Sequence, residues 1–318
     1  MANCTLNITD GIQIFQLATS IPTFIMGVLG NAYILIMFCR QPRSEWNYVK
    51  IYITNMAIAD CILLVILPIK IASFYQNLEG TSQLWDHSNK ELCYVLVSVY
   101  YVNMYVSIFT VTAISVVRYV AIKFPMKASG VLSCRRAMVV CALIWVVNCS
   151  FSAAFHRVDD PKQNATIKCF QKNKTEELPL VFILVLNIVG FLLPVLIMLY
   201  CSIKVIAKLR KELEIGSRVE KVQCIFIIAA NLVVFVICFF PVHLGFLFKY
   251  ITQANNYSCD VQFLAHNFVH GAMCISSMNC GLDSFSYYFA TKRSWNMCCT
   301  DKTRNEEYEC VSRSKSQM

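Results

Sequence analysis

Five side chains with oxygen atoms that can act as ligands lie inside stretches of sequence that carry almost no other charge. Asn103 and Ser107 are four residues apart, and so are Asn279 and Asp283. Residues four apart share one face of a helix, so each pair would present two oxygen atoms together. Asp60 lies in a third stretch of the same kind. Ionisable groups inside a membrane are costly to bury, which makes these residues candidates for function.

Lys70 is a cationic candidate in the same apolar stretch as Asp60, ten residues further along. A helix rises about 1.5 Å per residue, so the two groups would lie roughly 15 Å apart along its axis. That depth would place Lys70 just inside one mouth of a membrane protein. Its ammonium group could bind an anion there, or it could extend to the water at the membrane surface.

The elements that must position these residues are long and apolar. Soluble proteins carry about 25% charged residues, whereas this chain of 318 residues carries 15% and is 57% hydrophobic. A helix that crosses a membrane needs roughly 20 apolar residues. Seven stretches qualify: 11–39, 51–74, 92–117, 137–155, 178–203, 222–248 and 261–291. Lipid offers no hydrogen-bond partners, so each stretch must be helical.

The predicted fold is an all-α membrane protein, a seven-transmembrane helix bundle with a short amphipathic eighth helix. The predicted segments are an outer N-terminus at 1–11, the transmembrane domain at 12–290, the amphipathic helix at 291–301 and a polar tail at 302–318. No basic residue precedes the first apolar run, so we expect no cleaved signal peptide. Pro68, Pro194 and Pro241 lie inside three spans and should kink them.

Lysine and arginine residues gather in alternate connections between the spans. The first, third and fifth connections and the segment after the last span are basic, which places them in the cytoplasm. Five glycosylation sequons fall on the opposite side. Their asparagines are Asn3, Asn7, Asn164, Asn173 and Asn256. We therefore expect a multi-pass protein of the plasma membrane with an extracellular N-terminus.

Most of the 17 cysteines fall in or beside apolar runs, where a free cysteine behaves as a small hydrophobe. Cys4, Cys93, Cys169 and Cys259 fall on the predicted outer side, in an oxidising space. We expect a disulfide between Cys93 and Cys169. A second bond between Cys4 and Cys259 stays open, because four cysteines allow three pairings.

Several motifs, in order along nearly the whole chain, are similar to those of rhodopsin-like (class A) G-protein-coupled receptors. N-M-A-I-A-D at 55–60 resembles the family's N-L-A-x-A-D, and V-R-Y at 117–119 stands where the family has D-R-Y. C-F-F-P at 238–241 matches C-W-x-P, and D-S-F-S-Y at 283–287 matches N/D-P-x-x-Y. F-P-V-H-L-G-F at 240–246 resembles more closely the branch of receptors for lysophosphatidylinositol and kynurenic acid.

The resemblance implies roles for the residues already singled out. It makes Lys70 the anchor for an anionic head group. It places five residues around an allosteric sodium ion; two buried carboxylates without a cation would push at least one of them to protonate. These five are Asp60, Asn103, Ser107, Asn279 and Asp283. The alternative is a hydrogen-bond network between helices that holds no ion.

The resemblance also implies a ligand pocket and an inner switch. The remaining pocket residues would be Tyr100, Tyr101, Met104, His243, Phe246 and Lys249. The residues of the G-protein switch would be Val117, Arg118, Tyr119, Phe239, Pro241 and Tyr287. Because Val117 replaces the acid that ordinarily holds Arg118, we expect raised basal signalling. Cys298 and Cys299 stand where palmitoylation commonly pins the amphipathic helix.

The resulting hypothesis is a receptor that binds an anionic lysolipid or a small organic anion and activates heterotrimeric G proteins. Arrestin and a receptor kinase would be further partners. A non-signalling scavenger receptor of the same fold is the alternative, suggested by Val117, Phe239 and Ser284. No nucleophile–base pair suggests an enzyme, and the pair His266 and His270 lacks a third metal ligand. A transporter would need inverted repeats, which are not evident.

Overall fold

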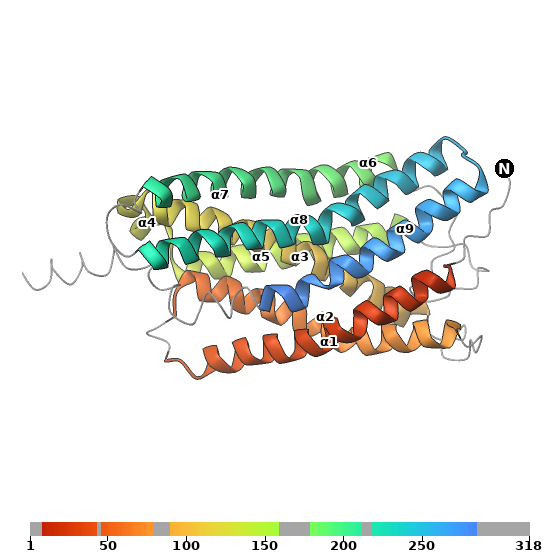
Figure 1. Ribbon diagram of the computed structural model, residues 1–318, viewed down its shortest axis with the longest axis horizontal. Coiled ribbons are helices and arrows are strands. Elements are labelled where there is room, and N and C mark those ends of the chain that lie inside the picture. Colours follow the sequence, from red (N-terminus) through yellow and green to blue (C-terminus); the bar gives the residue numbers. More distant parts are fainter. Residues whose placement is uncertain (1–7, 43–45, 79–89, 159–178, 212–217, 285–318) are drawn as a thin grey trace, which may run out of the picture.

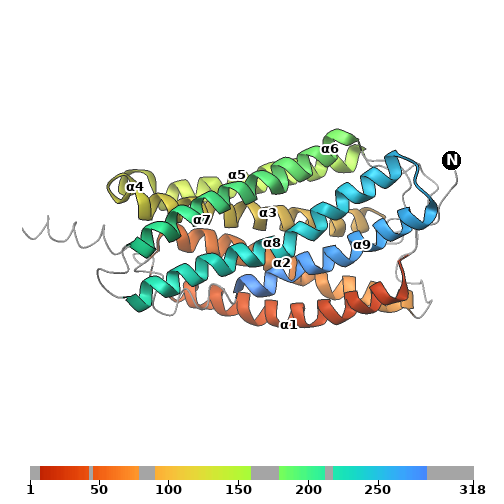
Figure 2. The same ribbon diagram turned by 45° about the horizontal axis from the view of Figure 1, so that its top comes forward.

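Seven long helical rods make up the part of the chain that the structure describes. The computed structural model describes residues 8–42, 46–78, 90–158, 179–211 and 218–284. The rods are α1 (Asp10–Cys39), α2 (Tyr48–Leu78), α3 (Lys90–Lys123), α5 (Cys134–Val158), the joined α6 (Leu180–Leu184), η3 (Val185–Leu192) and α7 (Leu193–Lys211), then α8 (Arg218–Ala254) and α9 (Cys259–Ser277). They lie side by side along the long axis (Figures 1 and 2). The predicted all-α bundle is confirmed.

The rods close into a ring around a central helix. α1 contacts α2 and α9, α9 contacts α8, and α8 contacts α7. α3 contacts α2, α5 and α7 and is the most central rod. We call the end of the bundle where α1 begins the outer end, and the end where α4 (Pro125–Val131) lies the inner end (Figure 1). This short helix α4, in the connection from α3 to α5, was not predicted.

Six of the rods are long and apolar enough to cross a membrane. The seventh, α9, does not reach that hydropathy because it carries Asp260, His266 and His270 within 19 residues. It still packs between α1 and α8, with His266 and Asn267 buried. Helical turns resume at 279–284 after Met278, and the rest of the predicted span 261–291 lies outside the described residues.

Proline changes the helix type in the rod that holds Pro194. A proline lacks the backbone N–H and its ring clashes with the carbonyl four residues earlier. The residues before Pro194 form the π-helix η3, whose wider turns accommodate that loss. Gly190 of η3 lies against the Tyr105 ring, where a Cβ atom would be 2.6 Å from the nearest ring carbon. Pro22 also lies inside α1 and was not singled out from the sequence.

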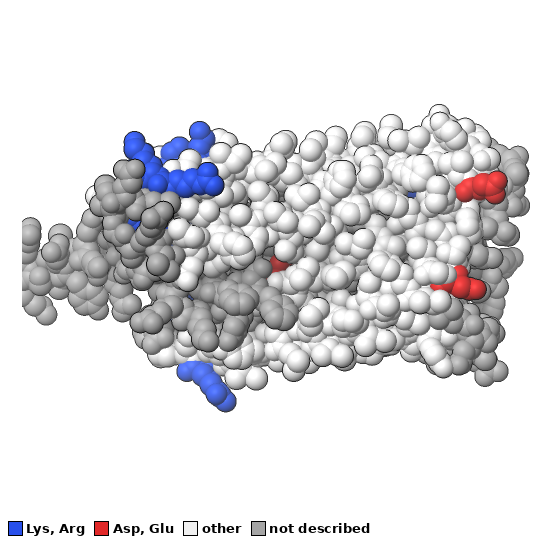
Figure 3. Space-filling view, viewed as in Figure 1, with Lys and Arg blue, Asp and Glu red and all other residues white. Residues whose placement is uncertain are grey.

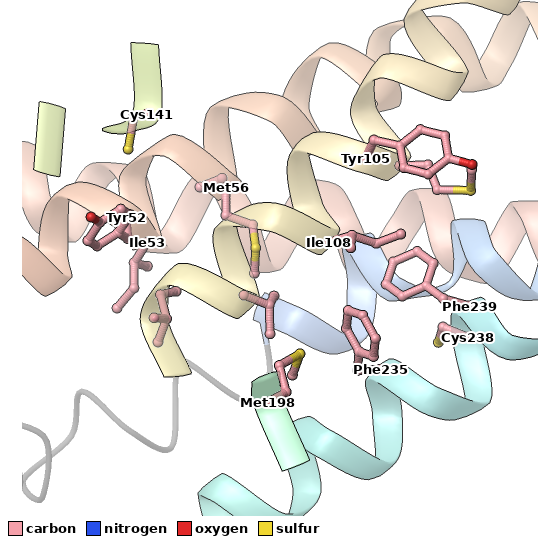
Figure 4. Packing of buried hydrophobic residues seen from close by; sticks show 14 of the residues in the cluster. Tyr52, Ile53, Met56, Tyr105, Ile108, Cys141, Met198, Phe235, Cys238 and Phe239 are labelled. Carbon is pink, nitrogen blue, oxygen red and sulfur yellow. The ribbon is translucent and has the colours of Figure 1, made fainter. Parts of the chain in front are cut away.

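The core and the surface both fit a helix bundle in lipid. Phe235 and Phe239 of α8 point toward Ile108 of α3 and Met198 of α7 in the buried cluster (Figure 4). Large apolar side chains such as Val65 and Phe226 are exposed instead. On the face in Figure 3, basic side chains gather at the inner end and acidic ones at the outer end. The long middle is almost free of charge.

A hydrogen-bonded asparagine joins three rods near the inner half of the bundle. The Asn55 amide group donates from Nδ2 to Thr110 Oγ1 over 3.0 Å. Its Oδ1 accepts from Trp145 Nε1 over 2.9 Å. These bonds tie α2 to α3 and α5, so Asn55 of the N-M-A-I-A-D motif and Trp145 together join the three helices.

Gly30 allows α1 to approach the chain beyond α9. A Cβ atom at Gly30 would lie 2.0 Å from Ser284 Oγ and 2.5 Å from Ser284 Cβ. Gly30→Ala should therefore lower the free energy of unfolding by about 1–3 kcal/mol, the usual cost of overpacking. The measurement is the thermal unfolding midpoint in detergent. Gly11→Ala is the matched control, since nothing lies within 4 Å of its Cβ position; an equal effect of both variants would contradict the close approach.

Candidate functional site

A small cavity of about 10 Å³ lies between α2, α3, α8 and the chain around the end of α9. That volume just holds one water-sized particle. Its walls include Asp60 from α2, Asn103 and Ser107 from α3, and Asn279. Asp283 does not line the cavity; its Oδ2 accepts a hydrogen bond from Asn279 Nδ2 over 2.5 Å. Four of the five predicted residues thus meet at one cavity, and the fifth lies behind Asn279.

Four of the oxygen atoms at this cavity have no hydrogen-bond partners among the described residues. They are both carboxylate oxygens of Asp60, Oδ1 of Asn103 and Oγ of Ser107. All three residues are buried, and buried polar atoms without partners are costly. A set made only of oxygen atoms, with a carboxylate among them, suits a small hard cation. The hydrogen-bond network that was the alternative does not pair these four atoms.

Tyr100 connects α3 to α9 beside the same cavity. Its hydroxyl group donates to the Met273 carbonyl and lies 2.8 Å from Ser277 Oγ and 3.2 Å from Ser276 Oγ. The Tyr100 side chain is buried, and it also lines the cavity. Its polar atom is therefore used by α9, and the face of its ring is the part that remains for other contacts.

The ammonium group of Lys70 lies over the face of the Tyr100 ring. Its Nζ lies 4.1 Å from the centroid of the Tyr100 ring and 5.7 Å from that of Phe74. Contacts of this kind attract a cation to the electron-rich face of an aromatic ring. The side chain is only 4% exposed, so it does not extend to water as the alternative required. No described acidic residue forms an ion pair with it.

His243 links the predicted pocket to the inner switch. Its Nδ1 lies 2.7 Å from the Phe239 carbonyl oxygen, which can only accept, so Nδ1 carries the proton and donates. Nε2 is then an acceptor for the Tyr105 hydroxyl group at 3.3 Å. The imidazole also stacks on Phe191 of η3, with ring centroids 4.6 Å apart. The imidazole is thereby held by contacts from α3, η3 and α8 itself.

Other predicted pocket residues lie around His243 and Lys70. The Phe246 ring centroid is 5.9 Å from that of His243 and 6.3 Å from that of Tyr101. The Tyr101 and Tyr100 rings meet edge to face at 5.9 Å. Met104 is buried in the cavity wall below them. Lys249 lies nearer the outer end of α8, within electrostatic reach of His266 and His270 rather than of the aromatic rings.

Sequence reasoning missed Tyr105 and Phe191 as contacts of His243. Tyr105 follows Tyr101 by four residues and therefore shares its helix face, which was the available signal. Phe191 gave no comparable signal, because it lies in an apolar run and is one of 21 phenylalanines in the chain. Its position depends on the π-helix η3, which the sequence pattern does not predict.

The residues of the predicted switch lie in two separate places, one at the inner end of the bundle and one near its middle. Val117 and Arg118 are buried at the inner end of α3, and the Tyr119 ring meets that of Tyr200 of α7 at 5.7 Å. Phe239 and Pro241 lie in the middle of α8, and Phe239 lines the cavity beside Asp60. Tyr287 lies outside the described residues.

Val117 is the basis of a prediction about basal activity. A carboxylate at this buried position would hold Arg118 in place by a charge-assisted hydrogen bond. Val117→Asp should therefore lower ligand-free G-protein activation several-fold. The measurement is nucleotide exchange without agonist at matched surface expression, with the uncharged Val117→Asn as the control. Ligand-free activity in the parent chain that is no higher than in Val117→Asp would contradict the raised basal signalling.

Few of the predicted modification sites fall within the described residues. Asn256 does: it is exposed in the turn after α8, with a left-handed φ of 50° that asparagine tolerates. Cys93 and Cys259 are disulfide-bonded, and so is Cys224 of α8, which was expected to be a free thiol. The pairings stay predictions. Asn3, Asn7, Asn164, Asn173, Cys4, Cys169, Cys298, Cys299 and the helix at 291–301 lie outside the described residues.

Seven helices around a polar centre, with an apolar belt and a basic inner end, are the architecture of seven-helix membrane receptors. The family described as "7 transmembrane receptor (rhodopsin family)" matches residues 30–287. The chain belongs to this family. It is a multi-pass membrane receptor, and because the family is not enzymatic the expectation of no enzyme holds.

Relatives place the chain within the family. It is 31% identical over 309 residues to G-protein coupled receptor 55 of Mus musculus, covering 91% of this chain and 90% of the relative. It is 32% identical over 270 residues to G-protein coupled receptor 35 of Homo sapiens, covering 84% and 81%. Lysophosphatidic acid receptor 4 of Homo sapiens is 30% identical over 277 residues, covering 84% and 71%. The predicted branch is confirmed.

Proposed function

We propose that the chain is a plasma-membrane receptor for an extracellular anionic lysolipid, similar to lysophosphatidylinositol, or for a small organic anion. It activates heterotrimeric G proteins when the ligand binds. The observation that carries this proposal is Lys70, whose ammonium group is buried on the Tyr100 ring without a described acidic partner. A buried charge is costly unless an opposite charge compensates it, and an anionic head group would do so. The similarity to a receptor named for lysophosphatidic acid supports a lysolipid.

The contacts of His243 suggest how such a ligand acts on the helices. A ligand held at Lys70 would lie against Tyr101 and Phe246, and Phe246 contacts His243. His243 is bonded to the Phe239 carbonyl group, one turn further toward the centre of the bundle. A ligand that favours one position of this histidine would shift the equilibrium between the inactive and the active arrangement of α8.

We also propose that the central cavity binds a sodium ion. Asp60, Asn103 and Ser107 would hold it through the oxygen atoms that lack partners, and Asn279 completes the wall. A bound ion would supply a positive charge that compensates the Asp60 carboxylate. These residues fit a small cation by their donor atoms and by the size of the cavity.

The remaining partners follow from the proposed topology. The basic inner end and the acidic outer end in Figure 3 support an extracellular N-terminus. G protein, arrestin and a receptor kinase would then bind the inner end, including Arg118. In this topology the sequons lie on the extracellular side, and the exposed position of Asn256 would allow its glycosylation. Palmitoylation of Cys298 and Cys299 and the bonds Cys93–Cys169 and Cys4–Cys259 belong to the same proposal.

The direct test is a G-protein activation assay on membranes that contain the full chain. Lysophosphatidylinositol, lysophosphatidic acid and kynurenate are added separately, with a neutral lysolipid as the control. We expect at least one anionic compound to raise nucleotide exchange. Binding without exchange would favour the scavenger receptor, and no binding of any anion would contradict the proposed ligand class.

A further inference from the structure

The outer half of α1 has a polar face where a membrane helix would normally bury apolar residues. The buried residues on this face include Gln13, Gln16, Ser20 and Thr23, spaced as one face of a helix. The exposed fraction of the side chain is 6% for Gln13 and 1% for Gln16. Their amide nitrogens donate to the carbonyl groups of Ile8 and His270. Their Oε1 atoms have no hydrogen-bond partner among the described residues.

The facing part of α9 contains a histidine with the same property. His266 is fully buried, and neither of its ring nitrogens has a hydrogen-bond partner in the described part of the chain. The His270 ring lies against it, with centroids 4.5 Å apart. The described residues contain no group of three histidine, cysteine or acidic side chains that could hold a metal ion. Lys249 and Lys70 lie within electrostatic reach of His270 and would repel a cation.

This polar cluster is continuous with the proposed anion anchor. Cys274, two turns after His266 on α9, lies within electrostatic reach of Lys70 and within hydrogen-bonding reach of Gln16. Gln16 in turn contacts the His270 carbonyl group at 3.5 Å. A head group held at Lys70 would therefore have the polar side chains between α1 and α9 as its next neighbours.

The atoms without partners determine which hydrogen-bond donors and acceptors the head group must provide. The two amide oxygens can only accept hydrogen bonds, and a neutral imidazole ring has one donor and one acceptor. The cluster therefore needs three donors and one acceptor. Carboxylate and phosphate oxygens only accept, whereas hydroxyl groups both donate and accept. Several hydroxyl groups next to one anionic group match this pattern.

We infer that Gln13, Gln16 and His266 form a subsite for hydroxyl groups, and that the ligand is a phosphate ester with a polyhydroxylated head group. The part that concerns Lys70 rests on the proposed function. Gln16 and His266 are then the residues that distinguish such a ligand from a simple phosphate or carboxylate of the same charge.

The test compares two lysolipids that share the acyl chain and the phosphate but differ in hydroxyl groups. Gln16→Met and His266→Phe keep the volume and remove the hydrogen-bonding atoms. Each should weaken the binding of lysophosphatidylinositol by about tenfold, the effect of one or two lost hydrogen bonds. Binding of lysophosphatidic acid should change less than about threefold. Glycerophosphoinositol, which has no acyl chain, shows whether the free head group has the same sensitivity; equal sensitivity also supports the subsite.

Two controls separate the subsite from a purely structural role. Thr19→Val removes a neighbouring hydroxyl group that already donates to the Phe15 carbonyl, and it should leave both affinities unchanged. Gln16→Met should not lower the thermal stability of the ligand-free receptor, because the Oε1 atom that it removes has no partner among the described residues and the Nε2 bond that it removes is long, at 3.5 Å to the His270 carbonyl. Equal loss for both lysolipids, unchanged affinities or a loss of stability would overturn the inference. If the unaltered chain binds neither lysolipid but binds kynurenate, the inference fails and the proposed function stands; if it binds no anion, both fail.

Discussion

Replacing Lys70 by methionine is expected to lower the potency of an anionic agonist by at least about 100-fold while the receptor still reaches the cell surface. Removing one partner of a buried charge pair costs about 3–5 kcal/mol, which corresponds to a factor of roughly 100 or more in affinity. The contact with the Tyr100 ring at 4.1 Å is weaker than such a pair, so methionine can replace it. The variant should therefore fold.

The matched control for Lys70 is a buried lysine at the other end of the same helix. Lys50 lies at the inner end of α2 and donates from Nζ to Gln41 Oε1 over 2.7 Å. Lys50→Met should leave agonist potency within about threefold of the parent, because its ammonium group is far from the pocket. Potency is read from a concentration–response curve of G-protein activation. Full potency in Lys70→Met would exclude this residue as the anchor.

Asp60→Asn should abolish the effect of sodium on agonist affinity. The proposed sodium ion and the agonist would favour different states, so raising sodium in the parent chain should weaken agonist binding by about five- to 150-fold, the usual range of coupling between sites. Asparagine removes the charge that would hold the ion at the cavity, and Asn103 and Ser107 alone supply only neutral oxygens. Agonist affinity should then be independent of sodium.

The sodium titration is carried out at constant ionic strength with choline as the replacement cation, because salt screens surface charges as well. Asp260→Asn, at an exposed acid in the first turn of α9, is the control and should keep the full sodium effect. If sodium does not change the agonist affinity of the parent chain, the cavity oxygens do not hold a sodium ion that acts on agonist binding.

The spans of this chain could be predicted closely because the thickness of a membrane sets the length of a helix. The first predicted span, 11–39, differs from α1 (Asp10–Cys39) by one residue. The second, 51–74, is shorter than α2 (Tyr48–Leu78), because polar residues at both ends continue the helix outside the apolar run. Helix type was not predictable, since η3 depends on packing against α3 as well as on Pro194.

The candidate site was predictable where polar atoms stand out from an apolar background. Asp60, Asn103 and Ser107 were found in this way and meet at one cavity. Gln13 and Gln16 were missed, although they stand out too, because the sequence does not show which face of α1 is buried. The use of the Tyr100 hydroxyl group by α9 also depends on how the two rods meet, which no local pattern contains.

The π-helix η3 has a consequence for comparing this chain with its relatives. Each π turn accommodates about one residue more than an α turn, and one residue corresponds to about 100° of rotation around a helix axis. Compared with a relative whose rod is α-helical throughout, the side chains of α6 are therefore rotated about the helix axis relative to those of α7. Aligning this chain with such a relative without a gap would shift the residue register on one side of Val185–Leu192. A deletion of one residue there would turn the outer part of the rod and carry Phe182 away from Phe151 of α5.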